Sequence, residues 1–153
     1  MPLEEQIQSD LKSAMKSGQK EKVTTLRSLM ALIKDERIKL RTKREMTEDD
    51  IIQVILSAVK KRKEAIGLYK QGKRDDLVKK EQEELNILQT YLPEQLSEEK
   101  TAEIIDKIIA EVNASSIKDL GRVMGAAMGQ LKGKADGKLV QNLVRQRLTQ
   151  ISQ

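Results

Sequence analysis

A stretch rich in glycine and lysine, residues 115–138, holds the side chains best suited to binding a partner. Gly121, Gly125 and Gly129 recur every four residues beside apolar positions, so they predict one helix with a thin glycine side. Glycine destabilises a helix interior by about 1 kcal/mol relative to alanine, and three at this spacing therefore indicate a backbone that something approaches closely. Another helix is the more ordinary neighbour, and an RNA or protein backbone is the alternative.

The loop that follows this predicted helix could hold a phosphate. It reads Gly133, Lys134, Ala135, Asp136, Gly137 and Lys138. Asp136 is suited to cap the next helix, and the free N–H groups and positive dipole end of a helix start attract anions, which the two lysines would strengthen. The loop is not a Walker A motif, because Met128 and Ala135 stand where that motif needs glycine and serine or threonine.

Positive charge gathers in the same part of the chain. Residues 94–114 hold two basic and six acidic residues, whereas residues 115–153 hold seven basic and two acidic residues, a net charge of +5. A basic end favours an anionic partner, although a solvated basic face is a common alternative. The candidate nucleic-acid contacts are the basic residues around the glycines: Lys118, Arg122, Lys132, Lys134, Lys138 and Arg145.

The composition removes most catalytic chemistry. The 153 residues include no cysteine and no histidine, so thiol nucleophiles, thiolate or imidazole metal ligands and a serine–histidine triad are all missing. Carboxylates are plentiful but show no recognisable catalytic spacing. We therefore assign no catalytic residue, no metal site and no cofactor, and a self-sufficient enzyme is the weakest of the functional interpretations.

Apolar residues repeat at helical spacing along the chain, and no stretch alternates as a strand would. Start and stop signals predict seven helices: residues 3–15 closed by Gly18, 23–40, 48–71 between Thr47 and Gly72, 75–91, 98–112 capped by Ser97, one entered through Ser115 or Ser116, and one from Gly137. The third and fourth are lysine-rich and glutamate-rich, which predicts that they pair as an antiparallel hairpin.

Pro93 marks the expected boundary between two parts, because the residue before a proline is pushed out of the helical conformation. We predict an all-α fold in which an N-terminal bundle of about four helices, residues 1–92, precedes a compact three-helix C-terminal subdomain, residues 93–153. Tyr69 and Tyr91 are the two aromatic residues of the chain, so aliphatic side chains must fill both cores.

A second basic run lies between Lys34 and Arg44. A solvated helix end is the more ordinary interpretation of such a run. A second RNA contact is the alternative.

The start of the chain, Met1 to Ala14, lacks the apolar core of a signal peptide. No stretch is long and apolar enough to predict a membrane span. These features lead us to expect a cytoplasmic protein without membrane contact.

The chain resembles the tail of GatB, the B subunit of the bacterial tRNA-dependent amidotransferase, in two motifs that occur in the same order. They are Leu120-Gly121-x-Val123-Met124-Gly125 and Lys132-Gly133-Lys134-Ala135-Asp136-Gly137. The whole chain, including Tyr91-Leu92-Pro93-Glu94-Gln95-Leu96, resembles the small free-standing YqeY proteins that share this tail.

The resemblance implies an all-helical module that binds tRNA as an accessory to amidation of a mischarged glutamyl or aspartyl ester. The kinase and glutaminase chemistry lies elsewhere in such a complex, so the resemblance implies no activity of this chain alone. Because no aromatic residue follows Tyr91, we expect contacts with phosphate, sugar and shape rather than with stacked bases. The alternative is an adaptor whose glycine side docks a helix of an amidotransferase or an aminoacyl-tRNA synthetase.

Overall fold

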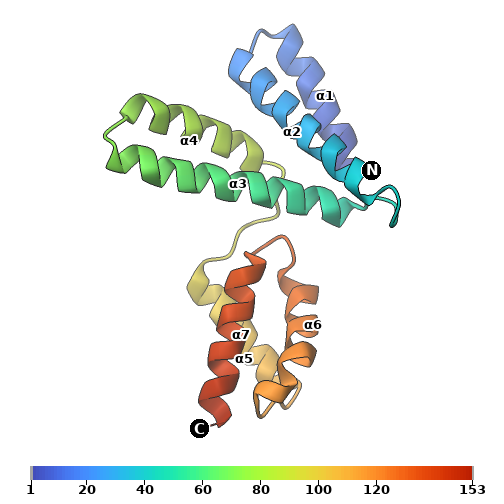
Figure 1. The fold of residues 1–153 in the computed structure, drawn as a ribbon, viewed down its shortest axis with the longest axis vertical. Coiled ribbons are helices and arrows are strands. Elements are labelled where there is room, and N and C mark those ends of the chain that lie inside the picture. The colour runs from blue at the N-terminus through green and yellow to red at the C-terminus, as the bar shows by residue number, and fades with distance from the viewer. Residues whose placement is uncertain (1, 153) are drawn as a thin grey trace. The chain divides into compact units, whose positions relative to one another are not determined.

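A computed structural model describes residues 2–152, and every regular element in that range is helical (Figure 1). The elements are α1 (Pro2–Lys16), α2 (Lys20–Leu40), α3 (Glu48–Gln71), α4 (Asp75–Gln89), α5 (Glu98–Glu111), the short 3-10 helix η1 (Ile117–Asp119), α6 (Leu120–Leu131) and α7 (Gly137–Ser152). The all-α prediction is confirmed. The chain divides into two compact units, Met1–Leu92 and Pro93–Gln153, and each has its own hydrophobic core.

In the N-terminal unit, α1 and α2 form a hairpin that turns at Gly18 (Figure 1). Gly18 has a φ of +69°, a left-handed conformation that side chains rarely adopt, and Gln19 N donates to Ala14 O at 3.0 Å across the turn. The predicted stop at Gly18 is therefore correct.

The start of α3 is held by a capping box. Asp50 N donates to Thr47 Oγ1 at 3.3 Å, and Thr47 N donates to Asp50 Oδ2 at 2.8 Å. Arg44 donates to both oxygens of the same carboxylate, at 2.6 and 2.8 Å. The Arg44 guanidinium, followed by the Thr47 N–H, holds the pKa of Asp50 well below its usual range.

The hairpin of α3 and α4 follows the predicted connection. Gly72 N donates to Leu68 O at 3.0 Å and ends α3, and α4 begins at Asp75. Arg62 on α3 pairs with Glu84 on α4 at 3.3 Å, with side chains only 20% and 14% exposed. Arg62 is one of four consecutive basic residues in α3, residues 60–63, and it lies on the side of α3 that faces α4. Its aliphatic part is shielded there, and its guanidinium pairs with Glu84.

The core of the N-terminal unit is aliphatic apart from one tyrosine. Its buried members come from all four helices and the turn after α4: Ile7, Leu26, Leu29, Ile33, Ile51, Ile55, Ala58, Val59, Ile66, Leu85, Leu88 and Tyr91. Tyr91 Oη donates to Asp10 Oδ2 at 2.6 Å and so ties the end of α4 to α1. Burial, with the Asp10 carboxylate beside it, raises the pKa of Tyr91 far above its usual range, and the hydroxyl remains a donor.

In the C-terminal unit, α5, α6 and α7 all contact one another around a second aliphatic core (Figure 1). Ser97 Oγ accepts from Lys100 N at 3.1 Å and caps α5 as predicted. Ser116 and Asp119 form a capping box that opens η1 and leads into α6. The buried core residues are Ile105, Ile108, Ile109, Val123, Ala127, Leu131, Ala135, Val140, Leu143, Val144 and Leu148.

We expect a glutamate-specific protease to cut the native chain first at Glu45 or Glu94. Both are exposed and lie outside the helices, whereas cleavage at Glu83 or Glu84 requires opening of α4. Mass spectrometry of early fragments identifies the sites, and circular dichroism of the pieces separated at Glu94 should still show helix. First cuts inside α4 would contradict the expectation that the two connections are cleaved before any helix opens.

We expect Tyr91→Phe to lower the free energy of unfolding by about 1 kcal/mol, because it removes the hydrogen bond to Asp10 and leaves a half-buried carboxylate without that donor. Urea unfolding measures the change. Tyr69→Phe is the matched control, since the Tyr69 hydroxyl has no hydrogen bond to a described residue, and it should cost less than about 0.5 kcal/mol. Equal losses in the two variants would show that the Asp10 contact contributes nothing.

Candidate functional site

The glycines of α6 form an open face. Val123, Ala127 and Leu131 are fully buried on the opposite side of this helix, while Gly121, Gly125 and Gly129 are exposed. A Cβ atom built on any of these three glycines meets no described heavy atom within 4 Å beyond the local helix backbone. We call the surface of Gly121, Gly125 and Gly129 the glycine face.

Within the C-terminal unit, neither α5 nor α7 comes close enough to touch a Cβ atom on the glycine face. Of the two neighbours that the spacing suggested, a helix of this same unit is therefore not the one present. Folding alone gives these positions no reason to lack a side chain, because alanine would fit at each and would favour the helix.

Three of the predicted basic residues lie around the glycine face. Lys118 is exposed in η1, helical periodicity places Arg122 on the same side of α6 as the glycines, and Lys132 is exposed directly after that helix ends. Arg122 is already engaged: it donates to Val112 O at 2.6 Å and pairs with Asp119 at 3.1 Å. Lys132 is exposed and also takes part in an interaction within the protein.

Asp119 fixes the turn that leads into η1 and α6. Its carboxylate accepts from Ser115 N at 2.8 Å and from Ser116 N at 3.3 Å, besides pairing with Arg122. The backbone donors of Ser115 and Ser116, and then Arg122, lower the pKa of Asp119 below its usual value. Arg122 thus links the residue that follows α5 to the start of α6.

The α6–α7 loop is built as the sequence suggested. Gly133 is buried with a φ of +79°, and Asp136 Oδ1 accepts from Lys138 N at 3.2 Å at the start of α7. Gly137 is exposed there, and so are the side chains of Lys134 and Lys138. Neither lysine side chain forms an ion pair with another described residue.

Arg145 lies seven residues, or two helical turns, beyond Lys138, so the two share a side of α7. Arg145 is exposed and forms no ion pair with another described residue. Arg147, two residues further, belongs to a different side, where it pairs with Asp106 of α5 at 2.9 Å.

Two residues that the sequence did not single out for the site hold the loop in place. Gln95 Nε2 donates to Gly133 O at 2.6 Å, and Leu96 N donates to Lys134 O at 2.9 Å. The segment after Pro93 and the loop before α7 are therefore one structure, although 38 residues separate Gln95 from Gly133. The only signal for this in the sequence is that the two motifs occur in the same chain.

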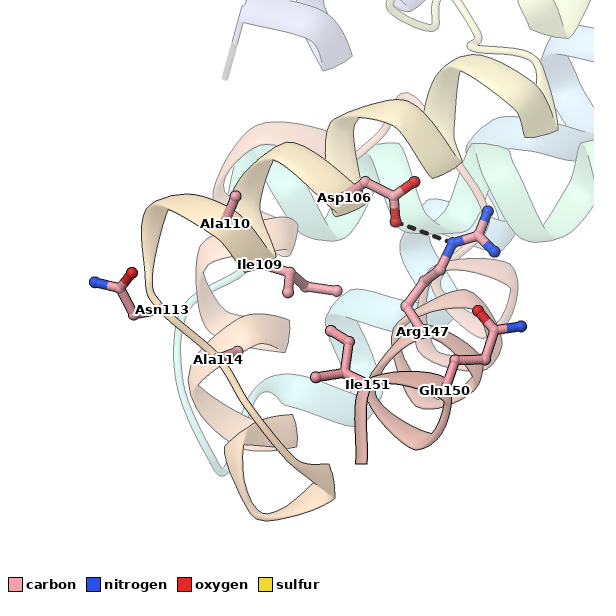
Figure 2. Close-up of a pocket in the computed structure, with 8 residues that line it drawn as sticks. All are labelled: Asp106, Ile109, Ala110, Asn113, Ala114, Arg147, Gln150 and Ile151. Atoms are coloured by element: carbon pink, nitrogen blue, oxygen red, sulfur yellow. Dashed lines mark ion pairs between the residues drawn. The ribbon is translucent and has the colours of Figure 1, made fainter. Parts of the chain in front are cut away.

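A hollow of the C-terminal unit lies between α5 and α7, away from the glycine face. It has a volume of about 610 Å³ and is lined by Asp106, Ile109, Ala110, Asn113, Ala114, Arg147, Gln150 and Ile151 (Figure 2). Figure 2 shows the Asp106–Arg147 ion pair on its rim, between α5 and α7. It contains none of the predicted site residues, so the candidate site is a surface rather than a pocket.

Among residues 2–152, no three histidine, cysteine or carboxylate side chains are placed to hold a metal ion. In the same range, no helix is long and apolar enough to cross a membrane.

We expect Gly125→Ala to raise the free energy of unfolding by about 1 kcal/mol, since the position is helical, exposed and open to a Cβ. Thermal or urea unfolding measures this, with Gly133→Ala as the opposite control, because Gly133 has a positive φ that alanine resists. A loss of stability in Gly125→Ala would mean that the glycine face packs against something within the protein.

Comparison with known proteins identifies relatives along most of the chain. The family model described as Yqey-like protein matches residues 4–148. A protein of Saccharomyces cerevisiae (strain YJM789) named altered inheritance of mitochondria protein 41, mitochondrial, is 35% identical over 86 residues, which are 56% of this chain and 46% of that protein. Its namesake in Kluyveromyces lactis is 31% identical over 112 residues, 71% and 60% of the two chains. An uncharacterised protein of Schizosaccharomyces pombe is 34% identical over 91 residues, 60% and 72%.

The cytoplasmic location expected from the sequence is wrong by this comparison. The relatives from Saccharomyces and Eremothecium are named as mitochondrial proteins. The expectation rested on the lack of an apolar leader and of a membrane span. Neither feature is informative here, because mitochondrial targeting segments are amphipathic and arginine-rich rather than apolar.

The chain spans about half the length of the Saccharomyces relatives it matches. The family match is broader, since it runs through both units and includes every predicted site residue. A match over residues 4–148 makes this chain a member of the YqeY-like protein family.

Proposed function

We propose that this YqeY-family protein is an accessory module that binds tRNA through the glycine face and the basic residues around it. The observation that carries the proposal is the openness of that face: three exposed helix positions without side chains, which no other part of the C-terminal unit covers. The Cα atoms of a helix lie only about 2.3 Å from its axis, whereas side chains extend the radius of the helix to about 5–6 Å. An RNA backbone can therefore approach α6 several ångströms closer here than on an ordinary helix.

The charge of this region supports an anionic partner. Residues 120–135 contain no carboxylate, while Lys118, Lys134, Lys138 and Arg145 carry charges that no described acid neutralises. The acids of the C-terminal unit gather instead on α5, where Glu98, Glu99, Glu103 and Asp106 line a groove that no α6 residue lines. The positive field is thus concentrated at the glycine face and the α6–α7 loop.

The kind of RNA contact follows from the residues present. The C-terminal unit has no aromatic side chain on which an unpaired base could stack. Lysines, backbone N–H groups and a smooth helix face suit phosphates and 2′-hydroxyls, which double-helical RNA displays along its shallow groove. We therefore assign the helical part of a tRNA, rather than a single-stranded loop, to this surface.

The proposed role is to position tRNA for an enzyme that performs the chemistry. The resemblance to the GatB tail points to tRNA-dependent amidation, with an amidotransferase or an aminoacyl-tRNA synthetase as the protein partner. The activation and ammonia-supplying steps would belong to that partner. The names of the fungal relatives support a mitochondrial setting for this role.

We expect Lys134→Ala and Lys138→Ala each to reduce the slope of log K against log salt for tRNA binding by about 1, and to weaken binding by similar factors across tRNA species. Lys107→Ala is the matched control, because it removes the same charge from an exposed position on α5. Fluorescence anisotropy with labelled tRNA at several salt concentrations measures the slopes. Slopes equal to that of the parent in both loop variants would remove the phosphate assignment.

An adaptor function is the second candidate, because the glycine face also meets the small-residue requirement for close approach of a helix. Gly125→Leu separates binding from folding, since a Cβ atom there meets no described neighbour and leucine favours a helix, so the variant should melt no lower than the parent. Loss of a protein partner in Gly125→Leu, with tRNA binding unchanged, would favour the adaptor. Loss of tRNA binding favours the RNA interpretation.

A further inference from the structure

The end of α2 and the turn after it form a concentrated basic segment in the N-terminal unit. Residues 37–44 read Arg-Ile-Lys-Leu-Arg-Thr-Lys-Arg, five basic residues without a carboxylate, between Asp35-Glu36 on one side and Glu45 on the other. We call this the 37–44 segment. All five basic residues are exposed.

Two of these five basic side chains link the 37–44 segment to neighbouring helices of the N-terminal unit. Arg37 pairs with Glu4 of α1, and Arg44 donates both guanidinium nitrogens to Asp50 at the start of α3. The backbone between them turns back on α2, since Lys43 N and Arg44 N both donate to Leu40 O, at 2.8 and 2.9 Å. The segment is therefore anchored at both ends.

The other three basic side chains do not link the segment to another described part of the chain. Lys39, Arg41 and Lys43 form no ion pair or hydrogen bond through their side chains with any described residue. They fall within five residues of one another, so the chain can separate the outer two by at most about 14 Å. A nucleic-acid strand carries several phosphates over that length.

Helix stability does not account for all three. Cations favour the negative end of the helix dipole only within its last turn, which includes Arg37 and Lys39. Arg41 and Lys43 come after Leu40, where α2 ends. Their charge is thus available to a partner.

We infer that the 37–44 segment is a second phosphate-binding surface for the RNA proposed above, contacted through Lys39, Arg41 and Lys43. This inference rests on the proposed function, and it adds the N-terminal unit to the interface. Three phosphate contacts alone bind weakly, but a second surface on the same chain acts at a high effective concentration once the first is bound.

An anionic membrane is the other polyanion that basic segments contact. Interfacial segments combine their basic residues with a broad apolar face. Here Ile38, 48% exposed, is the only large apolar side chain with substantial exposure in the 37–44 segment. One isoleucine gives little to insert, and the segment fits RNA better than lipid.

The test is a triple variant of the full-length chain, Lys39→Gln/Arg41→Gln/Lys43→Gln, with Arg37 and Arg44 retained so that both anchors remain. The matched control is Lys12→Gln/Lys16→Gln/Lys20→Gln, which removes three exposed charges at the other end of the α1–α2 hairpin. The 21-residue α2 separates the two ends by about 30 Å, several Debye lengths at physiological salt.

We expect the triple variant to reduce the salt slope for total tRNA by about 2 to 3, whereas the control keeps the parent slope. The affinity lost between roughly 50 and 200 mM salt should then be about 16- to 64-fold smaller than in the parent. Identical slopes in the triple variant and its control would overturn the inference. A triple variant that binds tRNA as the control does but loses vesicles with about one-third phosphatidylserine would also overturn it, in favour of a membrane surface.

Lys134→Ala in the same series separates this inference from the proposed function. A slope lowered by Lys134→Ala but not by the triple variant leaves the proposed function standing and removes the 37–44 surface. A slope lowered by the triple variant alone supports the 37–44 surface and removes the α6–α7 loop as an RNA contact. A parent chain that shows no salt-dependent tRNA binding overturns both.

Discussion

The hydrogen bonds from the segment after Pro93 to the α6–α7 loop set the form of the candidate site. Gly133 is buried and has a left-handed conformation, and a buried carbonyl oxygen needs a donor within the protein. Gln95 supplies that donor through its side-chain amide, and Leu96 supplies a backbone N–H to the next carbonyl. These two bonds hold the loop backbone, and the side chains of Lys134 and Lys138 are exposed beside it.

Both units have hydrophobic cores that are built almost entirely from aliphatic side chains. Leucine, isoleucine and valine at helical spacing fill each interior, and the two aromatics both belong to the N-terminal unit. Ion pairs lie outside these cores. Exposed pairs such as Arg74–Asp76 contribute little to the free energy of unfolding. The partly buried Arg62–Glu84 pair is different in kind, because it joins two helices where water has less access.

The glycine face opposes local stability. Each exposed glycine in α6 weakens the helix, and the neighbouring core gains nothing from the missing side chain. Conflict between local preference and observed residue is expected where a surface serves binding rather than folding. The same region lacks carboxylates, so shape and charge at α6 favour the same kind of partner.

The helices and most of their ends could be predicted from the sequence alone, because these depend on neighbours within a few residues. Gly18, Thr47, Gly72, Ser97 and Ser116 all act where their chemistry predicted, and the apolar periodicity identified both cores. The family, too, was recognisable from the motifs at Leu120 and Lys132. The cellular location was not recognisable, since targeting signals are read by receptors and leave no mark on the packing of a folded chain.

Which helix surfaces remain uncovered depends on how the helices pack, and this could be seen only in the folded structure. Periodicity placed Gly121, Gly125 and Gly129 on one side of a helix but could not say whether α5 or α7 would cover them, because that depends on how three helices pack around one core. The engagement of Arg122 with Val112, and the contact of Gln95 with Gly133, likewise join residues far apart along the chain. Such contacts arise from the summed burial of many side chains, and no local pattern encodes them.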